Sequence, residues 1–457
     1  MQALGIKQFK YLIIFEVIIG VIAIIDYLPA LIIIISLLSL FLLYQSFQEP
    51  LFALLLLMFS ILAGSLGVVK FNGKAPPILF VDIVFPIIVF LLVIKSLYSE
   101  KNRDSYTTLS LYWIPFLIWG LLSFIIAVDK FRALLIWKSY FAGFISFTFA
   151  YFSIQKGKHV KIIFASFIIW GIILASIEFF VLMQLGGLGH GLVDIFFKKN
   201  LVATSWGRSN YLATFYDIIV PLTLGYFLTI DSLKAKLFSG FSLLIMMSAE
   251  ILTLSRGGIL SLTIAIIFFL SRVIKPRTFF PILGALILVI GIILLNPLTY
   301  VLIQGLMTVD NSFSYFTRVN FYKDVVNMFL RNPIYGVGLG NLGFHSTFVL
   351  KTQESAHNIV LGMLGETGII GAIFFFTLLG KIIFELFRNY IIEKNDSLKI
   401  LKWALISSFV GALIHSMMEP NFEGFQFSIM VWILVALFMK INLLNIDDVK
   451  LKVLKSV

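Results

Sequence analysis

The sequence predicts an all-α polytopic membrane protein with about 14 (12–14) transmembrane helices. Hydrophobic residues make up 60% of the 457 residues and charged residues 13%, whereas soluble domains average roughly 45–50% and about 25%. The mean hydropathy is +1.03. The apolar runs are long and unbroken, unlike the alternating strands of a membrane β-barrel. These observations exclude a disordered chain, a collagen, a small disulfide-rich domain and an ordinary cytosolic enzyme.

Fourteen segments meet the requirement for a spanning helix, which is about 20 mostly apolar residues. Pro29 suits the first turn of a helix, so the first two segments can form a tight hairpin. The segments that begin at 237 and 257 are short and nearly touch. In chain order the predicted spans are residues 11–27, 29–48, 51–69, 77–98, 108–127, 133–154, 161–185, 211–230, 237–254, 257–273, 281–300, 358–386, 401–418 and 427–444.

Two outer connections, at 186–210 and 296–358, are longer than a hairpin needs. The second is predicted to contain a helix over 316–330, because apolar residues recur every fourth position from Phe321 to Phe329. This amphipathic helix has two interpretations. It lies on the membrane surface without chemistry, or it forms a lid or wall over an outward-facing site. In both cases we expect a large outer loop that contains short helices.

Lysine and arginine indicate the orientation of the chain. There are 35 of them against 23 Asp and Glu, which makes a net charge of +12. Most fall in connections on the side of the N-terminus, as in the cytoplasmic loops of membrane proteins, so both termini are predicted to be cytoplasmic. This distribution explains the positive charge without a nucleic-acid partner. The apolar run after Lys7 and Lys10 shows no signal-peptide cleavage site.

The segment Ser255-Arg256-Gly257-Gly258 places an arginine between two predicted helices at the outer face. Arginine beside hydrocarbon is costly, so it usually pairs or faces a cavity. Glycines let a backbone approach a ligand closely, and the N–H groups at the start of the next helix favour an anion. The segment therefore predicts a phosphate-binding site. The alternative is an arginine that reaches the lipid headgroups beside a glycine turn.

A second candidate is His357, at the mouth of a predicted outer helix. Histidine is the usual general base near neutral pH, and Asn358 or Glu366 could orient it or a sugar hydroxyl. The alternative is a helix-capping Asn358 beside an interfacial histidine. Three further histidines on the predicted outer side, His190, His345 and His415, could pair with acids such as Glu354 or Glu419.

Two more arginines lie on the predicted outer side, Arg208 before a helix and Arg318 in the long loop. Either can be an ordinary surface charge. Because they share that side with Arg256 and His357, a convergent cationic site is more credible. The chain has no cysteine, and no two histidines stand one helical turn apart. We therefore expect no metal and no cofactor.

A glycine-rich segment at 332–341, which includes Gly338 and Gly340, superficially resembles a phosphate-binding loop. No strand precedes it, and no Lys-Ser/Thr pair follows it. The segment is also predicted to lie outside the cell membrane, where there is no ATP. A nucleotide site is therefore a poor interpretation, and a tight loop that packs against the site is a better one.

These motifs together resemble the O-antigen ligase and O-antigen polymerase superfamily, in which they follow in the same order and spacing. The resemblance covers about residues 205–375. It implies a single integral-membrane domain over 1–457, with a GT-C-like fold, and a catalytic region at 205–375 that includes the outer loop 296–358. The residues that carry it are Ser255-Arg256-Gly257-Gly258, Arg318, Asn332-Pro333, Gly336-Val337-Gly338-Leu339-Gly340-Asn341, Ala356-His357-Asn358, Leu361, Glu366-Thr367-Gly368 and Gly371.

The resemblance implies a glycosyltransferase of the cytoplasmic (inner) membrane with its active site on the outer face. Its donor would be a polyprenyl-pyrophosphate-linked glycan, and its acceptor a second lipid-linked glycan or a terminal lipid or protein. A chain-length regulator is a further partner. A polymerase is favoured, because the outer loop is modest in length and no acceptor-binding domain is appended; a ligase is the alternative. A lipid-linked oligosaccharide flippase is a more distant alternative, disfavoured by the lack of a visible repeat.

The same resemblance implies roles for the candidate residues in an inverting displacement without a metal. Arg256 and one of Arg208 and Arg318 would bind the pyrophosphate, for which a guanidinium is well suited. His357 would accept the proton of the acceptor hydroxyl, or would itself bind phosphate. The supporting residues would be Ser255, Gly257, Gly258, Asn358, Glu366, Gly338 and Gly340.

Overall fold

The computed structural model describes residues 44, 49–63, 84–91, 106–184, 203–204, 206–281, 284, 318–346 and 355–441. These residues are almost entirely helical. A single short antiparallel pair, β1 (Ala203–Thr204) with β2 (Gly207–Arg208), is found among them. Seven of the described helices are long and apolar enough to cross a membrane, and three shorter apolar helices accompany them. The chain is therefore an all-α integral membrane protein, as predicted.

The described helices follow the predicted spans to within a few residues. The predicted span at 11–27, all of 29–48 except residue 44, and nearly all of 281–300 lie outside the described residues, so the total of about 14 spans stays a prediction. The helices are α3 (Pro50–Ala63), α5 (Tyr106–Leu122), α6 (Lys130–Ser153), α7 (Gly157–Gln184), α9 (Ser209–Thr229), α10 (Leu233–Leu252), α11 (Arg256–Val273), α14 (Leu342–His345), α15 (Ile359–Ile391), α16 (Asp396–His415) and α17 (Phe425–Ile441), with the 3-10 turns η1 (Ser123–Ile125) and η4 (Asn421–Glu423).

Side-chain caps explain where several of these helices begin. The first N–H groups of a helix have no partner within it, and a side-chain oxygen just before the first turn can accept from one of them. Five residues do this here: Asp129 before α6, Ser232 before α10, Ser255 before α11, Asn358 before α15 and Asn395 before α16.

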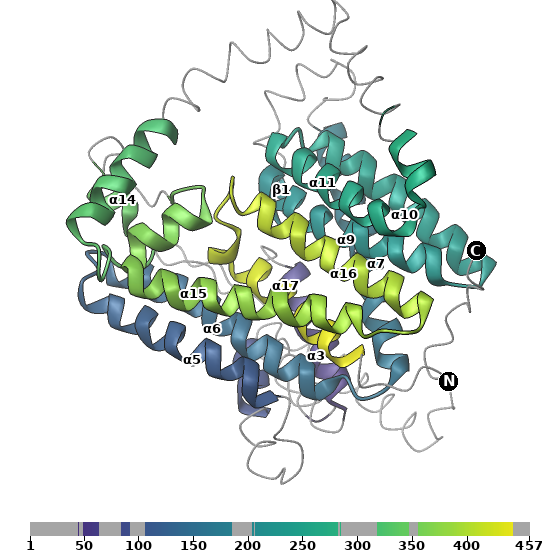
Figure 1. Ribbon diagram of the computed structural model, residues 1–457, viewed down its shortest axis with the longest axis horizontal. Coiled ribbons are helices and arrows are strands. Elements are labelled where there is room, and N and C mark those ends of the chain that lie inside the picture. Colours follow the sequence, from purple (N-terminus) through teal and green to yellow (C-terminus); the bar gives the residue numbers. More distant parts are fainter. Residues whose placement is uncertain are drawn as a thin grey trace, which may run out of the picture.

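The bundle consists of two groups of helices that share α15, α16 and α17 (Figure 1). On one side α6 packs along α17 and α5 packs along α15; on the other, α9 packs against α16, α10 and α11. Large apolar side chains such as Leu111, Leu244 and Leu260 remain exposed on α5, α10 and α11. Such side chains would be unfavourable in water, and they suit a belt that faces lipid.

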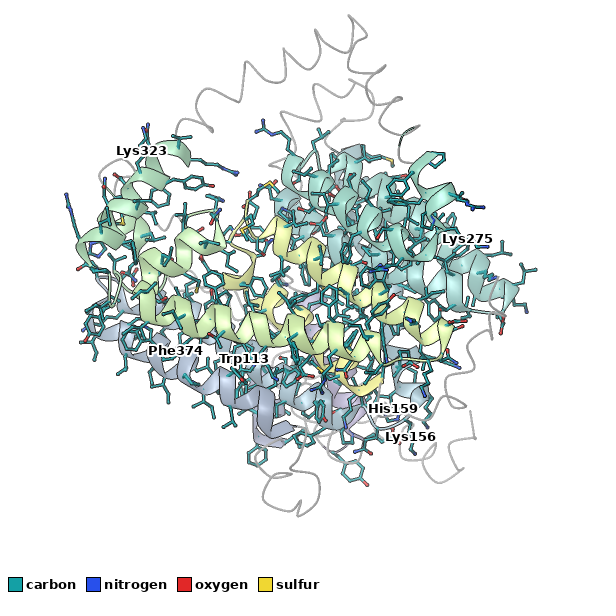
Figure 2. All side chains as sticks on the ribbon, in the orientation of Figure 1. Trp113, Lys156, His159, Lys275, Lys323 and Phe374 are labelled. Atoms are coloured by element: carbon teal, nitrogen blue, oxygen red, sulfur yellow. The ribbon has the colours of Figure 1, made fainter. Side chains whose placement is uncertain are left out.

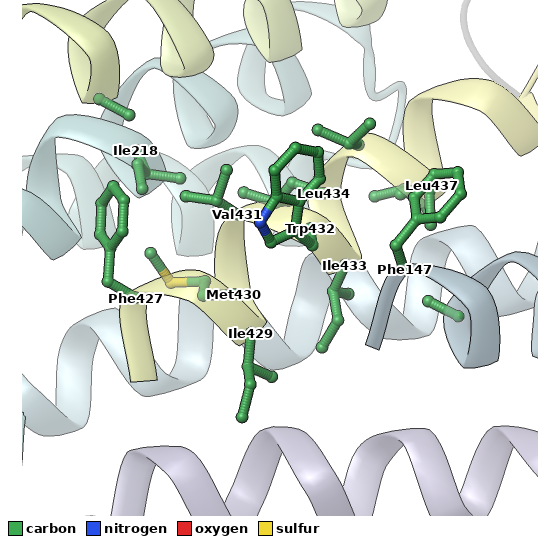
Figure 3. Packing of buried hydrophobic residues seen from close by; sticks show 14 of the residues in the cluster. Phe147, Ile218, Phe427, Ile429, Met430, Val431, Trp432, Ile433, Leu434 and Leu437 are labelled. Carbon is green, nitrogen blue, oxygen red and sulfur yellow. The ribbon is translucent and has the colours of Figure 1, made fainter. Parts of the chain in front are cut away.

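The core is densest around α17, which is buried on nearly every side (Figure 3). The Trp432 ring lies 4.4 Å from the ring of Trp113, centroid to centroid. Gly143 on α6 lies directly against Trp432, and a β-carbon there would come within 2.3 Å of the indole ring. A small residue therefore lets α6 and α17 approach closely, as small residues do between membrane helices.

The connections gather at two opposite ends of the bundle. One end, here called the site end, carries residues 123–129, 253–255 and 416–424; the opposite end carries residues 154–156 and 392–395. Lys156, His159 and Lys275 lie at the opposite end in Figure 2, far from Lys323 at the site end. The preference of cytoplasmic loops for lysine and arginine predicts that the opposite end faces the cytoplasm.

The long connection 296–358, predicted to lie outside, contains the predicted amphipathic helix, which spans residues 318–331. Phe321, Val325 and Met328 form its buried side and pack against Val337 and Ala356. The prediction of an amphipathic helix is confirmed. Its last buried residue is Met328, however, whereas the predicted Phe329 is only partly buried. The helix therefore packs against the rest of the site end.

Helix α15 is broken at Gly368, whose φ of 65° and ψ of −171° are not helical. Only glycine adopts this conformation without strain. The break leaves the carbonyl groups of residues 365–367 without their usual partners in the next turn. In a membrane protein such backbone groups must find other partners, because lipid supplies none.

The glycine-rich segment supplies these partners. The backbone of this segment forms hydrogen bonds with residues on both sides of the break. The indole of Trp119 on α5 donates one more. The hydrogen bonds are Val337 N to Gly365 O (2.9 Å), Gly338 N to Glu366 O (2.8 Å), Ile369 N to Pro333 O (2.8 Å) and Trp119 Nε1 to Thr367 O (2.8 Å). The prediction that this segment is a packing loop and not a nucleotide site agrees with this arrangement.

Replacing Gly368 by Ala is expected to destabilise the protein by about 3 kcal/mol or more, through backbone strain and steric overlap. A β-carbon at this position would lie 2.2 Å from the carbonyl oxygen of Ile334. Gly380→Ala is the matched control in the same helix, because a β-carbon there meets nothing within 4 Å. Thermal unfolding of both variants in the same detergent would test this, and equal stability would contradict it.

Candidate functional site

The N-terminus of α15 is fastened to the C-terminal end of α16. Asn358 caps α15 by accepting hydrogen bonds from two backbone N–H groups of the first turn, each at 3.0 Å. Its amide also donates to the carbonyl of Met417 (3.2 Å), and the N–H of Ile359 donates to the carbonyl of Ser416 (2.9 Å). The capping interpretation of Asn358 is therefore confirmed, and the cap also connects two helices.

His357 precedes this cap in a left-handed conformation, with φ of 48°. Residues other than glycine rarely adopt such a φ, and they do so most often where the surrounding structure holds them. Here the carbonyl of His357 accepts from the hydroxyl of Tyr322 at 3.5 Å. The imidazole is 26% exposed, so it is held by the protein on one side and accessible on the other.

Glu419 orients the imidazole of His357. Its Oε2 atom lies 3.1 Å from His357 Nδ1, and the Glu419 side chain is only 8% exposed. A carboxylate at this distance favours the tautomer with the proton on Nδ1, which leaves the basic lone pair on Nε2. The pair therefore has the arrangement of a general base and the group that positions it.

The other carboxylate oxygen of Glu419 also accepts hydrogen bonds. Oε1 accepts from Arg318 NH2 at 3.2 Å and from Asn210 Nδ2 at 2.7 Å. Burial by itself would raise the pKa of Glu419, but the hydrogen bond and charge of His357, together with the charge of Arg318, outweigh it and hold the pKa below its ordinary value. Glu419 is therefore ionised at neutral pH.

A fully buried polar layer supports the segment that carries Glu419. Nδ1 of His415 lies 2.5 Å from Asp217 Oδ2, and neither side chain is exposed. The hydroxyl of Thr214 lies 3.3 Å from the same nitrogen and donates to Asn421 Oδ1 at 3.0 Å. These contacts connect α9 to both sides of Glu419. The imidazole of His415 thus pairs with Asp217 and not with Glu419, and Glu354, the other acid that the sequence suggested as a partner for the outer histidines, lies outside the described residues.

The two residues Ser255 and Gly258 at the start of α11 have structural roles. Ser255 Oγ accepts from Gly258 N at 3.3 Å, so the cap uses one of the N–H groups expected to bind an anion. A β-carbon on Gly258 would lie 2.5 Å from Ala213 Cβ and 2.5 Å from Glu250 Oε1. Close helix packing, more than approach to a ligand, therefore explains this glycine.

The arginine candidates differ in how they relate to His357. Arg318 shares Glu419 with His357, so the structure brings these two together. Arg256 is exposed in the first turn of α11, beside Gly257, whose α-carbon faces His415 and Met418. Arg256 therefore lies at the same end of the bundle. For Arg208, the backbone is in β2 before α9, and its side chain lies outside the described residues.

Glu366 does not orient His357, contrary to one of the roles considered for it. It is fully buried in α15, where its carboxylate is close to the charges of Arg132 and Glu423. Helix α15 begins at Ile359, and the seven residues from there to Glu366 rise by about 10 Å, which takes Glu366 away from the start of α15 and into the bundle. Gly338 and Gly340 belong to the glycine-rich segment, where their positive φ values of 96° and 65° set the path of the backbone.

Glu423 is a second acidic group near His357. Its carboxylate lies against the first turn of α15, where a β-carbon on Gly362 would be 3.9 Å from Oε1. Burial raises the pKa of Glu423 to about 7, and the positive charges of Arg132 and His357 limit the rise. Glu423 therefore keeps its proton to higher pH than an ordinary glutamic acid does.

The sequence pointed to Glu419 only as a general partner for an outer histidine and did not connect it with His357, and neither Glu423 nor Asn210, which contacts Glu419, was a candidate. Glu419 is 62 residues from His357 and carries no local motif. The available signal was its place in a short connection between two predicted spans, on the same predicted side as His357. An acid in a short outer connection is a candidate partner for a histidine on that side.

An all-α membrane bundle with a histidine, a buried carboxylate and an arginine joined at one end defines a polytopic membrane protein with a polar site at that end. Residues 241–376 match the family model described as O-antigen ligase, a stretch that includes Arg256, Arg318 and His357. The match supports the resemblance of this chain to the superfamily of O-antigen ligases and polymerases. The matching family model points to a glycosyltransferase-like membrane enzyme and suggests lipid-linked glycan substrates. No curated protein matches the chain significantly.

Proposed function

We propose that this protein polymerises polyprenyl-pyrophosphate-linked oligosaccharide repeat units on the outer face of the cytoplasmic membrane. The observation that carries the proposal is the joined set of His357, Glu419 and Arg318. His357 and Arg318 lie within the stretch that matches the O-antigen ligase model, and Glu419 contacts both of them. A base beside a cation is what the transfer of a sugar from a pyrophosphate requires.

In the proposed reaction a hydroxyl oxygen of the acceptor attacks the anomeric carbon of the donor. A new C–O bond forms there while the bond from that carbon to the pyrophosphate oxygen breaks. His357 Nε2 takes the hydroxyl proton, and Glu419 stabilises the imidazolium that results. The leaving group departs as lipid pyrophosphate with the bonding electrons. Direct displacement inverts the configuration at the anomeric carbon.

Arginines would stabilise the negative charge that develops on the leaving group. The Arg318 guanidinium has five N–H donors. One contacts Glu419, and another reaches the carbonyl of Met418 at 3.5 Å, which leaves donors for phosphate oxygens. Arg256 would supply a second guanidinium from α11, and Arg208 is the remaining candidate. Within the same scheme, His357 could instead bind a phosphate oxygen.

The second candidate is a ligase that moves the finished glycan to a lipid or protein acceptor. The description of the matching family model favours it. The modest length of the outer loop favours the polymerase. Both would use the same His357 chemistry and differ in the acceptor. A flippase for lipid-linked oligosaccharides is a third possibility, but it would need its key polar groups near the middle of the membrane and not at one end.

Deleting the gene in its host and analysing the glycolipids and surface glycan would separate these functions. Surface glycan with single repeat units is the result expected for a polymerase. Long polymer left on polyprenyl pyrophosphate would instead mean a ligase. Repeat units trapped on the cytoplasmic side would overturn both and leave the flippase. In the polymerase case, complementation by the wild-type gene should restore long chains.

A further inference from the structure

A pocket of about 320 Å³ opens at the site end, away from His357. Its wall comes from the last residue of the helix 318–331, from the glycine-rich segment 332–337, and from one residue each of α14 and the α5–α6 connection. This volume lies within the range of sites for small ligands. None of the candidate residues identified from the sequence, apart from the glycine-rich segment itself, belongs to it.

Three polar side chains in this pocket have no partner among the described residues. Arg331, Asn332 and His345 line it, and no hydrogen bond or ion pair joins their side chains to the part of the chain that the structure describes. Burial lowers the pKa of His345, so its imidazole is neutral at pH 7 and can both donate and accept. The pocket therefore offers one cation and two neutral polar groups.

An aromatic ring forms the apolar part of the same pocket. Tyr335 lies flat on Trp119, with ring centroids 5.4 Å apart and an angle of 8° between the planes. The indole of Trp119 is fixed in turn by its hydrogen bond to Thr367. Tyr335 is nevertheless 57% exposed. A ring that is held in place and accessible offers a prearranged surface for the apolar face of a sugar.

The helix 318–331 connects this pocket to the candidate catalytic site. Arg318 at its start contacts Glu419, and Arg331 at its end lines the pocket. The helix is about 20 Å long between them. A glycan with several sugar residues can span that distance along the outer surface, so one chain can reach both places.

We propose that this pocket is a second saccharide subsite, which binds a negatively charged sugar of the glycan about 20 Å from Arg318, at the far end of the helix 318–331. Arg331 binds the acidic group, Asn332 and His345 bind hydroxyls, and the sugar ring stacks on Tyr335. The subsite rests on the proposed function, because only an enzyme acting on glycans would present a long saccharide here. It would hold the chain while the reacting end occupies the His357 site.

Direct binding to the full chain in phosphatidylcholine nanodiscs tests the subsite without requiring transfer. The probes are a hyaluronan tetrasaccharide, which carries glucuronic acid, and the neutral chitotetraose, compared by saturation-transfer NMR and titration. The acidic probe should bind about tenfold more tightly, because a charged hydrogen bond is stronger than a neutral one. Arg331→Gln should remove this preference. Tyr335→Leu should weaken the binding of both probes.

Two variants serve as matched controls. Lys323→Gln removes an exposed cation from the same helix, outside the pocket, and should leave binding of both probes unchanged. His357→Asn should also bind both probes as the wild type does. Unchanged binding of the acidic probe by Arg331→Gln or Tyr335→Leu would overturn the subsite. Loss of binding in His357→Asn would place the probe in the catalytic site and overturn it too.

Anionic phospholipid is the competing occupant. If phosphatidylglycerol nanodiscs abolish binding of the acidic probe, and Arg331→Gln restores it, the pocket is a lipid site and the proposal is wrong. The subsite and the proposed function can also fail separately. Transfer activity retained by His357→Asn would remove the proposed chemistry while saccharide binding stood, whereas wild-type binding by Arg331→Gln would remove only the subsite.

Discussion

Replacing His357 by Asn is expected to slow glycan transfer by about 10²- to 10⁴-fold, because general base catalysis contributes that much. Asparagine is the most suitable replacement here, since it tolerates the left-handed backbone of this position better than most residues. Its amide can also still donate to Glu419. Purified protein, supplied with lipid-linked repeat units, would show the change as a loss of product by mass spectrometry.

The matched control is His159→Asn, at the opposite end of the bundle, which should transfer at the wild-type rate (Figure 2). Thermal unfolding should show both variants folded. Donor binding should remain in His357→Asn if His357 is the base, whereas tenfold weaker donor binding with a smaller loss of rate would mean that it binds phosphate. Wild-type transfer by His357→Asn would overturn the assignment of the site.

Replacing Glu419 by Gln is expected to reduce the transfer rate by as much as about 10⁴-fold, because a neutral amide neither fixes the tautomer of His357 nor stabilises the protonated imidazole. The amide also disturbs the contact to Arg318, whose guanidinium then faces an N–H donor in one of the two amide orientations. The loss should appear in kcat more than in KM, since Glu419 acts through His357. A wild-type kcat in this variant would contradict the proposed positioning.

The pH dependence of Glu419 has a defined sign. Its pKa is below the ordinary value of a glutamic acid, so the unfolded chain takes up this proton at higher pH than the folded protein does. Its stabilising effect is therefore complete above the unfolded pKa and is lost as pH falls through the folded pKa. Stability of the wild type should fall in that acid range more than stability of Glu419→Gln. Glu385→Gln, near the other end of α15, is the control carboxylate.

The helices could be read from the sequence because each is a long apolar run with its own start signal. Helix α6 begins at Lys130, three residues earlier than predicted, because Asp129 caps it by accepting from Arg132 N. Helix α15 extends to Ile391 past its predicted end. Such differences arise at helix ends, where one or two polar residues decide the boundary. The hydrophobic runs themselves are local properties of the chain.

The candidate site could be read only in part. His357, Arg318 and Asn358 stand in short motifs, and their proximity followed from the side of the membrane that their segments were predicted to share. Glu366 stands in such a motif too, yet helix geometry carries it away from His357 and burial removes it from the surface. Glu419 has no motif, and only the packing of α16 beside the start of α15 brings it to His357.

The sequence by itself determined that this protein is a membrane bundle of helices, where the apolar segments of its described helices lie, and which motifs resemble those of the O-antigen ligase and polymerase superfamily. Those properties depend on runs of neighbouring residues. Only the tertiary structure decided that Glu419 orients His357, that Gly258 serves helix packing, and that the glycine-rich segment repairs the break at Gly368. Each of these depends on distances between segments far apart in the chain, which no local pattern records.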